Sequence, residues 1–436
     1  MGSLLAVGAR ALTMVIALVC GVLTTRMIIG GAGVDSFALY TLLTTIPSLL
    51  TFTDLGSGAV LVNAVATSEN VPTDEKLRYQ LTSVGRVLLM FAATAMALNT
   101  VLVLTGAWEL ALGEAGSRPG ASLAAFYCVT IFCLGIPLGV WGRIMLGQRR
   151  NHIVILLQGL ISPLTMIGVW LMLTFGGENL HSFVAIASFA ASILVALLGI
   201  LITARTTSPL IPTAARMVLR PRRYPGVRVM DVGWPMLAQM VTFPIAVGSQ
   251  RYVIAQLGGP TEVAEYGVAG QVFFALNGLV MAGGLALWPH FTKSRHDGDL
   301  RRGPFPLSVL FAVAIGLATV MVWLVGPWMF GFITQGELTV RPSTIFSFGL
   351  MIMMTAAVYP LGMFIMDKPG IRFQVIPTLS MAAVGLTLSF VLTPLLGIAG
   401  PLIGVAFALV VCQLIPFSIY IVRNKKRLTV GDPAQV

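Results

Sequence analysis

The sequence has very little charge for its length. Only 10% of its 436 residues are charged and 57% are hydrophobic, whereas about 25% of residues in soluble domains are charged. A soluble protein of this size cannot bury that much apolar surface, because surface-to-volume scaling limits the buried fraction. The composition therefore disfavours a soluble enzyme, a nucleic-acid-binding module and a disordered scaffold, and it indicates a polytopic membrane protein.

Cysteine and histidine are scarce as well. The four cysteines lie in apolar runs without a CxxC pair or a Cys/His cluster, so neither a zinc site nor a disulfide framework is predicted. The four histidines are scattered, and the sequence shows no Ser/His/Asp set and no phosphate-binding P-loop. We therefore expect no metal, no cofactor and no enzymatic activity.

Long apolar runs are abundant, and they set the fold class. A helix needs about 20 apolar residues to cross a hydrocarbon core of about 30 Å. Twelve segments meet this requirement, near residues 5–29, 37–65, 81–105, 122–146, 153–175, 182–204, 232–257, 266–290, 305–327, 343–366, 374–394 and 399–421. Strands are disfavoured because the runs are long and lack two-residue alternation. The sequence thus predicts an all-α polytopic membrane protein.

The basic residues orient the chain. With the N-terminus inside, 23 of the 27 lysines and arginines fall on the cytoplasmic side, leaving Arg26, Arg118, Arg251 and Arg341 on or near the outer side. Positive residues collect on the cytoplasmic side of membrane proteins. We therefore expect a multi-pass protein of the plasma (inner) membrane with both termini in the cytoplasm. The net charge of +11 is then explained by membrane topology, and we expect no nucleic-acid partner.

The two halves of the chain resemble each other at a nearly constant offset. The matches are Pro137-Leu138-Gly139 with Pro360-Leu361-Gly362 (offset 223), Trp108 with Trp328 (220), Arg26 with Arg251 (225) and Tyr40 with Tyr266 (226). Each half holds six predicted spans, so the halves are parallel repeats related by an axis along the membrane normal. The sequence therefore predicts two pseudo-symmetric six-helix bundles around a central cavity, an architecture typical of transporters.

Four regions follow from this duplication. We predict an N-terminal six-helix bundle over residues 1–204, a basic cytoplasmic linker over 205–230, a C-terminal six-helix bundle over 231–422 and a cytoplasmic tail over 423–436. The linker holds four prolines and six arginines. Within it, Thr213 to Arg220 form either a basic helix on the anionic inner membrane surface or part of a solvated connection.

Four residues are candidates for substrate binding, namely Arg26, Arg251, Gln250 and Asp54, because charged and polar groups within a membrane are costly and mark function. Arg26 lies about 24 Å along a helix from Arg10, and Arg251 matches it in the second half. Either these arginines extend to the outer headgroups, or they face one cavity as two cationic forks suited to phosphate or carboxylate. In the second case Gln250 extends the site.

Asp54 is the most conspicuous acid within a predicted span, in the stretch Thr53-Asp54-Leu55-Gly56-Ser57-Gly58. Three roles are open to it. It pairs with a cavity arginine, it titrates during a coupled transport cycle, or it caps a local helix break beside the glycines.

The N-terminal stretch resembles a known family. Thr25-Arg26, Phe37-Ala38-Leu39-Tyr40 and the glycine-rich stretch around Asp54 are similar to the N-terminal signature of Wzx-type polysaccharide flippases. These belong to the polysaccharide transporter branch of the multidrug/oligosaccharidyl-lipid/polysaccharide exporter superfamily. The resemblance implies that a polyprenyl-pyrophosphate-linked oligosaccharide moves from the inner to the outer leaflet for cell-surface polysaccharide export. It also implies that Arg26 and Arg251 contact pyrophosphate or acidic sugar.

The partners implied are the lipid-linked oligosaccharide, membrane lipids, and a polysaccharide polymerase and glycosyltransferases. Two other functions stay open. One is a drug or metabolite antiporter of the same superfamily, which the lack of an acid in the first span disfavours for cationic drugs. The other is a membrane glycosyltransferase or polymerase, which would normally need acids or a sizeable loop on the outer face.

Overall fold

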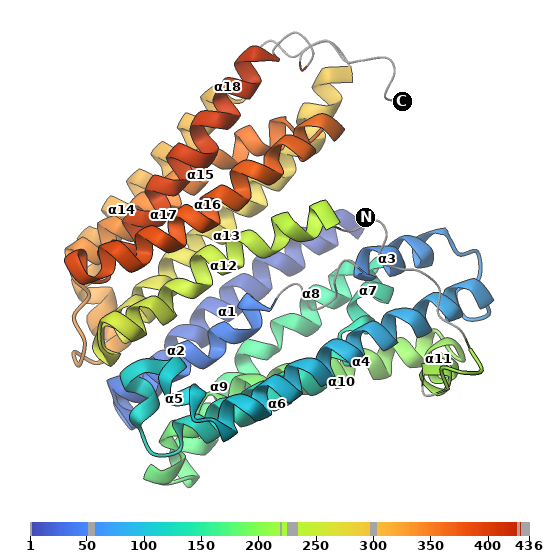
Figure 1. Cartoon of the computed structure of the whole chain (residues 1–436), viewed down its shortest axis with the longest axis horizontal. Helices are drawn as coiled ribbons and strands as arrows, with labels where there is room; N and C mark the ends of the chain where they lie inside the picture. The colour runs from blue at the N-terminus through green and yellow to red at the C-terminus, as the bar shows by residue number, and fades with distance from the viewer. Residues whose placement is uncertain are drawn as a thin grey trace. The chain divides into compact units, whose positions relative to one another are not determined.

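The structure, a computed structural model, describes residues 2–50, 57–218, 220–224, 234–296, 303–424 and 428. The chain is 87% helical, and no strand occurs among the described residues (Figure 1). A helix satisfies its own backbone hydrogen bonds, which is the requirement that a hydrocarbon environment imposes on a spanning segment. The predicted all-α fold class is confirmed.

Ten described segments are long and apolar enough to cross a membrane. They are Gly8–Ala32, Glu75–Leu104, Ala121–Gly147, Asn151–Phe175, Ile186–Thr206, Pro260–Gly284, Phe305–Thr334, Pro342–Phe364, Pro369–Leu396 and Ala399–Arg423. Each overlaps one predicted span. The other two predicted spans, 37–65 and 232–257, also contain helices. The first holds two helices on either side of residues 51–56, which lie outside the described residues, and the second is one helix.

The chain divides into two compact units, residues 1–241 and 242–436. The boundary between the units falls inside the helix Trp234–Leu257 and does not coincide with either end of the predicted linker. The predicted bundle limits at residues 204 and 231 therefore stay predictions.

Unit 1 is built from eleven described α-helices. They are α1 (Gly2–Ala32), α2 (Val34–Leu49), α3 (Ser57–Thr67), α4 (Glu75–Leu104), α5 (Ala107–Leu112), α6 (Ala121–Leu138), α7 (Val140–Gly147), α8 (Asn151–Gly159), α9 (Ile161–Phe175), α10 (Ile186–Thr206) and α11 (Leu210–Val218). Helices α4, α6 and α10 pack side by side, and α1 packs along α8 and α9 (Figure 1). Asn99 on α4 joins three of these elements, because it donates to the Phe126 carbonyl on α6 (3.0 Å) and accepts from the Trp108 indole on α5 (3.0 Å).

Unit 2 takes its helices from the second half of the chain. They are α12 (Trp234–Leu257), whose first residues belong to unit 1, then α13 (Pro260–His296), α14 (Phe305–Thr334), α15 (Pro342–Phe364), α16 (Lys368–Leu396), α17 (Ala399–Leu409) and α18 (Ile415–Arg423), with a π-helical turn at Val410–Leu414. Helix α15 lies at the centre and packs on α13, α14 and α17. It is also mostly buried, as expected for a helix surrounded by neighbours.

The outer faces of these helices are apolar. On α14, Leu310, Leu317 and Leu324 are 58%, 66% and 63% exposed, and their spacing of seven residues places them on one face. Apolar stripes of this size are rare on soluble proteins but face the lipid in membrane proteins. With the ten spans, this identifies a multi-pass membrane protein.

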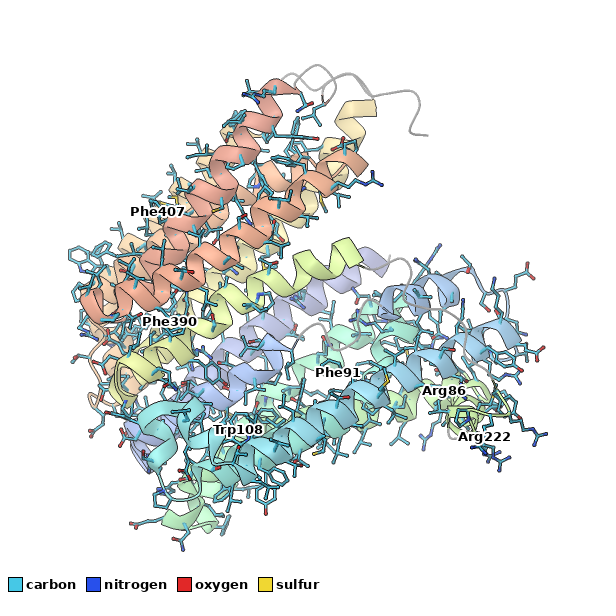
Figure 2. All side chains as sticks on the ribbon, in the orientation of Figure 1. Arg86, Phe91, Trp108, Arg222, Phe390 and Phe407 are labelled. Carbon is cyan, nitrogen blue, oxygen red and sulfur yellow. The ribbon has the colours of Figure 1, made fainter. Side chains whose placement is uncertain are left out.

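The basic linker contains a docked helix. Leu210, Ala214 and Met217 on α11 are buried, and α11 packs against α4. Arg86 on α4 donates to the carbonyls of Met217 (2.9 Å), Val218 (3.4 Å) and Tyr224 (2.7 Å). A cation at the carbonyl end of a helix is also favoured by the helix dipole. The apolar face of α11 therefore covers protein, whereas Arg216 is exposed; Figure 2 shows Arg86 and, beyond it, Arg222.

The helix bounds refine the internal repeat. Arg26 and Arg251 each lie six residues before the end of their helix, and Tyr40 and Tyr266 each lie six residues after the start of the next. The tryptophan match is looser than the sequence suggests. Trp108 is buried after the break that ends α4, whereas Trp328 lies within α14, which continues to Thr334, and is 75% exposed.

The close approach of α17 to α16 yields a testable prediction. A Cβ atom on Gly400 would lie 2.5 Å from the Leu392 carbonyl carbon, so Gly400→Ala must push the two backbones apart. Overpacking of this kind lowers the free energy of unfolding by about 1–3 kcal/mol. For a unit of this size, each kcal/mol lowers the melting temperature by roughly 2–4 °C. We expect a correspondingly lower melting temperature in detergent. The control is Gly331→Ala on α14, where a Cβ meets nothing within 4 Å; equal melting temperatures for the two variants would contradict the close packing.

Candidate functional site

Arg26 lies toward the C-terminal end of α1. It lies six residues before Ala32, which is about 9 Å along the helix. Its side chain is half-buried, between the buried residues Thr25 and Ile28. The predicted acid of the same half, Asp54, lies outside the described residues. The structure therefore places one of the two predicted site residues of unit 1.

Arg251 has the matching position on α12 and a defined aromatic setting. Its guanidinium carbon lies 5.7 Å from the ring centroid of Tyr266 and 6.0 Å from that of Phe274. Both rings are on α13, where Tyr266, Gly270 and Phe274 are spaced by four residues and so share one face. The glycine makes this approach possible, because a Cβ there would lie 3.0 Å from the Phe274 ring and 3.7 Å from Nη2 of Arg251.

The rings beside Arg251 belong to a packed aromatic cluster. Phe348 on α15 lies 4.8 Å from Tyr266, 5.3 Å from Phe273 and 5.8 Å from Phe274, measured between ring centroids. Tyr266, Phe273 and Phe348 are fully buried. Aromatic pairs at these separations add stabilisation beyond the area they bury. The cluster therefore gives Arg251 a rigid wall, and cation–π attraction favours the guanidinium against it.

Gln250, the third predicted site residue, is fully buried and hydrogen-bonded to three other helices, including a bond from its Nε2 to Sδ of Met351 on α15 (3.7 Å). Its Oε1 accepts a hydrogen bond from the Tyr266 hydroxyl on α13 (2.6 Å), and its Nε2 donates to the Pro401 carbonyl on α17 (3.2 Å). These bonds join α12, α13, α15 and α17 within unit 2. Direct contact of Gln250 with substrate stays a prediction, whereas its contact with the neighbour of Arg251 is part of the structure.

A charged cluster at the start of α13 was not predicted from the sequence. Glu265 is buried, and its carboxylate accepts from the Arg341 backbone N–H (2.9 Å), the Arg341 Nε (2.9 Å) and the Thr344 hydroxyl (2.5 Å). Arg341 and Thr344 open α15, so the cluster fastens α13 to α15. The predicted span 266–290 began one residue after Glu265, and this boundary error concealed an acid within the helix. Arg341, one of four arginines outside the cytoplasmic set, was the available signal.

The predicted residues are thus brought together in part. Gln250 and Arg251 share one cluster with Tyr266, whereas Arg26 belongs to the other unit. A cavity that both arginines face stays a prediction.

Comparison with protein families assigns the chain. The model of a family described as "Polysaccharide biosynthesis protein" matches residues 2–295. The chain belongs to this family. The match covers unit 1 from residue 2 and continues to residue 295, near the end of α13, so it includes the helices that carry both arginines. A comparison with curated proteins gives no match.

Solved structures share the fold over nearly the whole chain. Lipid II flippase MurJ in an inward closed conformation is 12% identical with a TM-score of 0.69, over 98% of this chain and 90% of that one. An inward-facing multidrug resistance MATE transporter of the MOP superfamily is 15% identical with a TM-score of 0.59, over 93% and 94%. A MOP superfamily transporter from Pyrococcus furiosus is 14% identical with a TM-score of 0.54, over 98% and 96%. At these identities the likeness establishes the fold of such transporters, with two helical bundles.

The Glu265 cluster yields a second prediction, tested by a double-mutant cycle. Arg341→Gln removes a charge-assisted hydrogen bond to a buried carboxylate, a bond worth about 1.5–3 kcal/mol. We expect Glu265→Gln and Arg341→Gln each to lower the melting temperature, and the double variant to lose less than their sum. Arg118 precedes α6 as Arg341 precedes α15, but the repeat places Leu39 where Glu265 would be. Arg118→Gln therefore serves as the control, because it removes an arginine from the equivalent position without this acid. Additive losses would show that the pair is not coupled.

Proposed function

We propose that this protein moves a polyprenyl-pyrophosphate-linked oligosaccharide from the inner to the outer leaflet by alternating access, for export of a cell-surface polysaccharide. Membership of the polysaccharide biosynthesis family supports a role in making a cell-surface polysaccharide. The fold shared with a lipid II flippase supports the kind of transport. In this proposal the chain is a transporter and carries out no chemical step.

The observation that carries the proposal is the matched pair of arginines. Arg26 and Arg251 are half-buried at the same distance from the ends of equivalent helices. Arginine at membrane depth is costly to keep unless it binds something. Its planar fork suits the paired oxygens of phosphates, and its donors point along the plane, so ring contacts on its face leave this geometry intact. Two such forks fit the two phosphates of a pyrophosphate.

The substrate site that we propose contains Arg26 and Arg251 as the anion ligands, with Gln250 and Asp54 beside them. The prenyl tail stays in lipid while the polar head crosses. Membrane lipids are therefore constant partners, and a polysaccharide polymerase and glycosyltransferases are the partners that would supply and use the substrate.

A drug or metabolite antiporter is the alternative that a specific observation favours, namely the fold shared with MATE transporters. The two functions differ in the effect of losing the gene. Loss of a flippase leads to accumulation of a lipid-linked sugar, which mass analysis of lipid extracts identifies. Loss of an antiporter leads to drug sensitivity without such an intermediate.

The arginine assignment gives the third prediction. We expect Arg26→Gln and Arg251→Gln each to weaken substrate recognition by about 10- to 100-fold, because each removes a charge-assisted bond of about 1.5–3 kcal/mol. The double variant should be made normally, block export and accumulate the lipid-linked intermediate. Arg222→Gln, an exposed arginine of the linker, is the matched control. Export at the wild-type level by the double variant would overturn the site.

The membrane orientation gives the fourth prediction. We propose that both termini lie in the cytoplasm of a plasma (inner) membrane protein, since 23 of 27 basic residues fall on that side. A reporter that is active only in the cytoplasm should work when fused after Val436 and when inserted in the linker beside Arg222. It should fail when inserted beside Gly336, between α14 and α15. The reverse pattern would contradict the orientation.

A further inference from the structure

Tyr266 makes two contacts that connect Gln250 to Arg251. Its ring lies beside the guanidinium of Arg251, 5.7 Å from centroid to carbon, and its hydroxyl donates to Oε1 of Gln250 at 2.6 Å. Gln250 and Arg251 are consecutive on α12, so their side chains leave the helix about 100° apart. One tyrosine on α13 therefore holds both of these neighbouring side chains.

The orientation of the Gln250 amide is fixed by its oxygen partners, Tyr266 and Pro401, and its third contact, from Nε2 to Sδ of Met351, is also to an acceptor. The Pro401 carbonyl is an acceptor only, so it requires the amide nitrogen at that end. The amide oxygen is then left facing the Tyr266 hydroxyl, which donates to it. A flipped amide would place two acceptors against each other at Pro401. A glutamate in place of Gln250 would have the same fault at one end, so the chemistry requires an amide.

The tyrosine itself has little freedom to move. It is fully buried, and Phe348 packs on it at 4.8 Å between ring centroids. The hydroxyl bond restrains the direction of the Cβ–Oη axis, and the packed Phe348 ring restrains rotation about that axis. The face that the ring presents to Arg251 is therefore set by three helices, through Gln250 on α12, Phe348 on α15 and Pro401 on α17.

The matching position in unit 1 has different chemistry. Tyr40 corresponds to Tyr266, but Thr25 stands where Gln250 would be expected. Threonine carries one hydroxyl, whereas glutamine carries a separate donor and acceptor at the end of a longer chain. The amide link is thus a property of unit 2.

We propose that Tyr266 is the positioning residue of Arg251, and that Gln250 fixes Tyr266 through its hydroxyl. The inference rests on the proposed function, in which Arg251 binds the anionic head of the substrate. A guanidinium held in its binding geometry loses less conformational entropy when the anion arrives, which strengthens binding without adding a contact. Gln250 then acts through Tyr266 and need not touch the substrate.

Tyr266→Phe tests the proposal because it keeps the ring and removes only the donor to Gln250. The probe is inorganic pyrophosphate, titrated calorimetrically into the purified full-length protein in detergent. We expect Tyr266→Phe and Gln250→Leu each to weaken pyrophosphate binding about threefold to tenfold, as loss of one buried hydrogen bond implies. In an Arg251→Gln background the same substitutions should have no further effect, because they act through Arg251.

A packing control separates positioning from stability. The control must lie outside the aromatic cluster of Tyr266 and Phe348, because that cluster is the wall beside Arg251. Phe364→Leu meets this requirement, since it removes a buried ring of unit 2 outside that cluster, in edge contact with Phe291. Phe364→Leu should lower the melting temperature yet leave pyrophosphate affinity unchanged. An affinity loss equal to that of Tyr266→Phe would show that general packing is responsible and would overturn the proposal.

The two proposals fail in distinguishable ways. Suppose that Arg251→Gln weakens pyrophosphate binding. If Tyr266→Phe then has no effect on affinity, or weakens binding further in the Arg251→Gln background, the site stands and the positioning role is wrong. If Arg251→Gln has no effect, the proposed site is wrong, and magnetic resonance of isotope-labelled arginine decides the positioning role without ligand. The Arg251 Nε–H signal should broaden or shift in Tyr266→Phe; an unchanged signal would overturn the inference.

Discussion

The structure depends first on the constraint that hydrocarbon places on backbone polar groups. An N–H or carbonyl without a partner costs several kcal/mol in lipid, so each spanning segment must bond within itself. The long helices of both units satisfy this constraint. Carbonyls at helix ends, which have no partner within the helix, need one from elsewhere, and side chains supply it in place of water. Arg86 donates to the last carbonyls of α11 and to that of Tyr224 beyond it. Gln374 donates to the Gly362 and Ile365 carbonyls at the end of α15.

Polar side chains inside the two units follow from this rule and divide into two groups. Asn99, Glu265 and Gln250 each bond to at least two partners on other elements, and they hold their helices together. Arg26 and Arg251 are half-buried six residues before the ends of their helices, and charge within a membrane span is costly to keep. Arg251 is also set against an aromatic wall, which orients it without neutralising it.

The repeat explains why the two halves are similar in layout and different in detail. Duplication preserved the helix phase, since the arginines and tyrosines keep the same distances from their helix ends. It did not preserve the neighbours. Trp108 is buried and Trp328 is 75% exposed, and Thr25 stands at the position of Gln250. Matched positions of the two halves thus have different surroundings.

Composition and run length determined the all-α class and the approximate spans, because hydrophobicity and the cost of bare backbone polar groups act locally along the chain. Matched residues at a nearly constant offset indicated the repeat. The same information located Arg26, Arg251 and Gln250, since charge and amide groups within apolar runs are conspicuous in one dimension. The docking of α11 on α4, the Glu265–Arg341 pair and the Tyr266 link from Gln250 to Arg251 were decided by the tertiary structure. Each joins residues on different helices, and hydropathy along a chain carries no information about which faces of two helices meet.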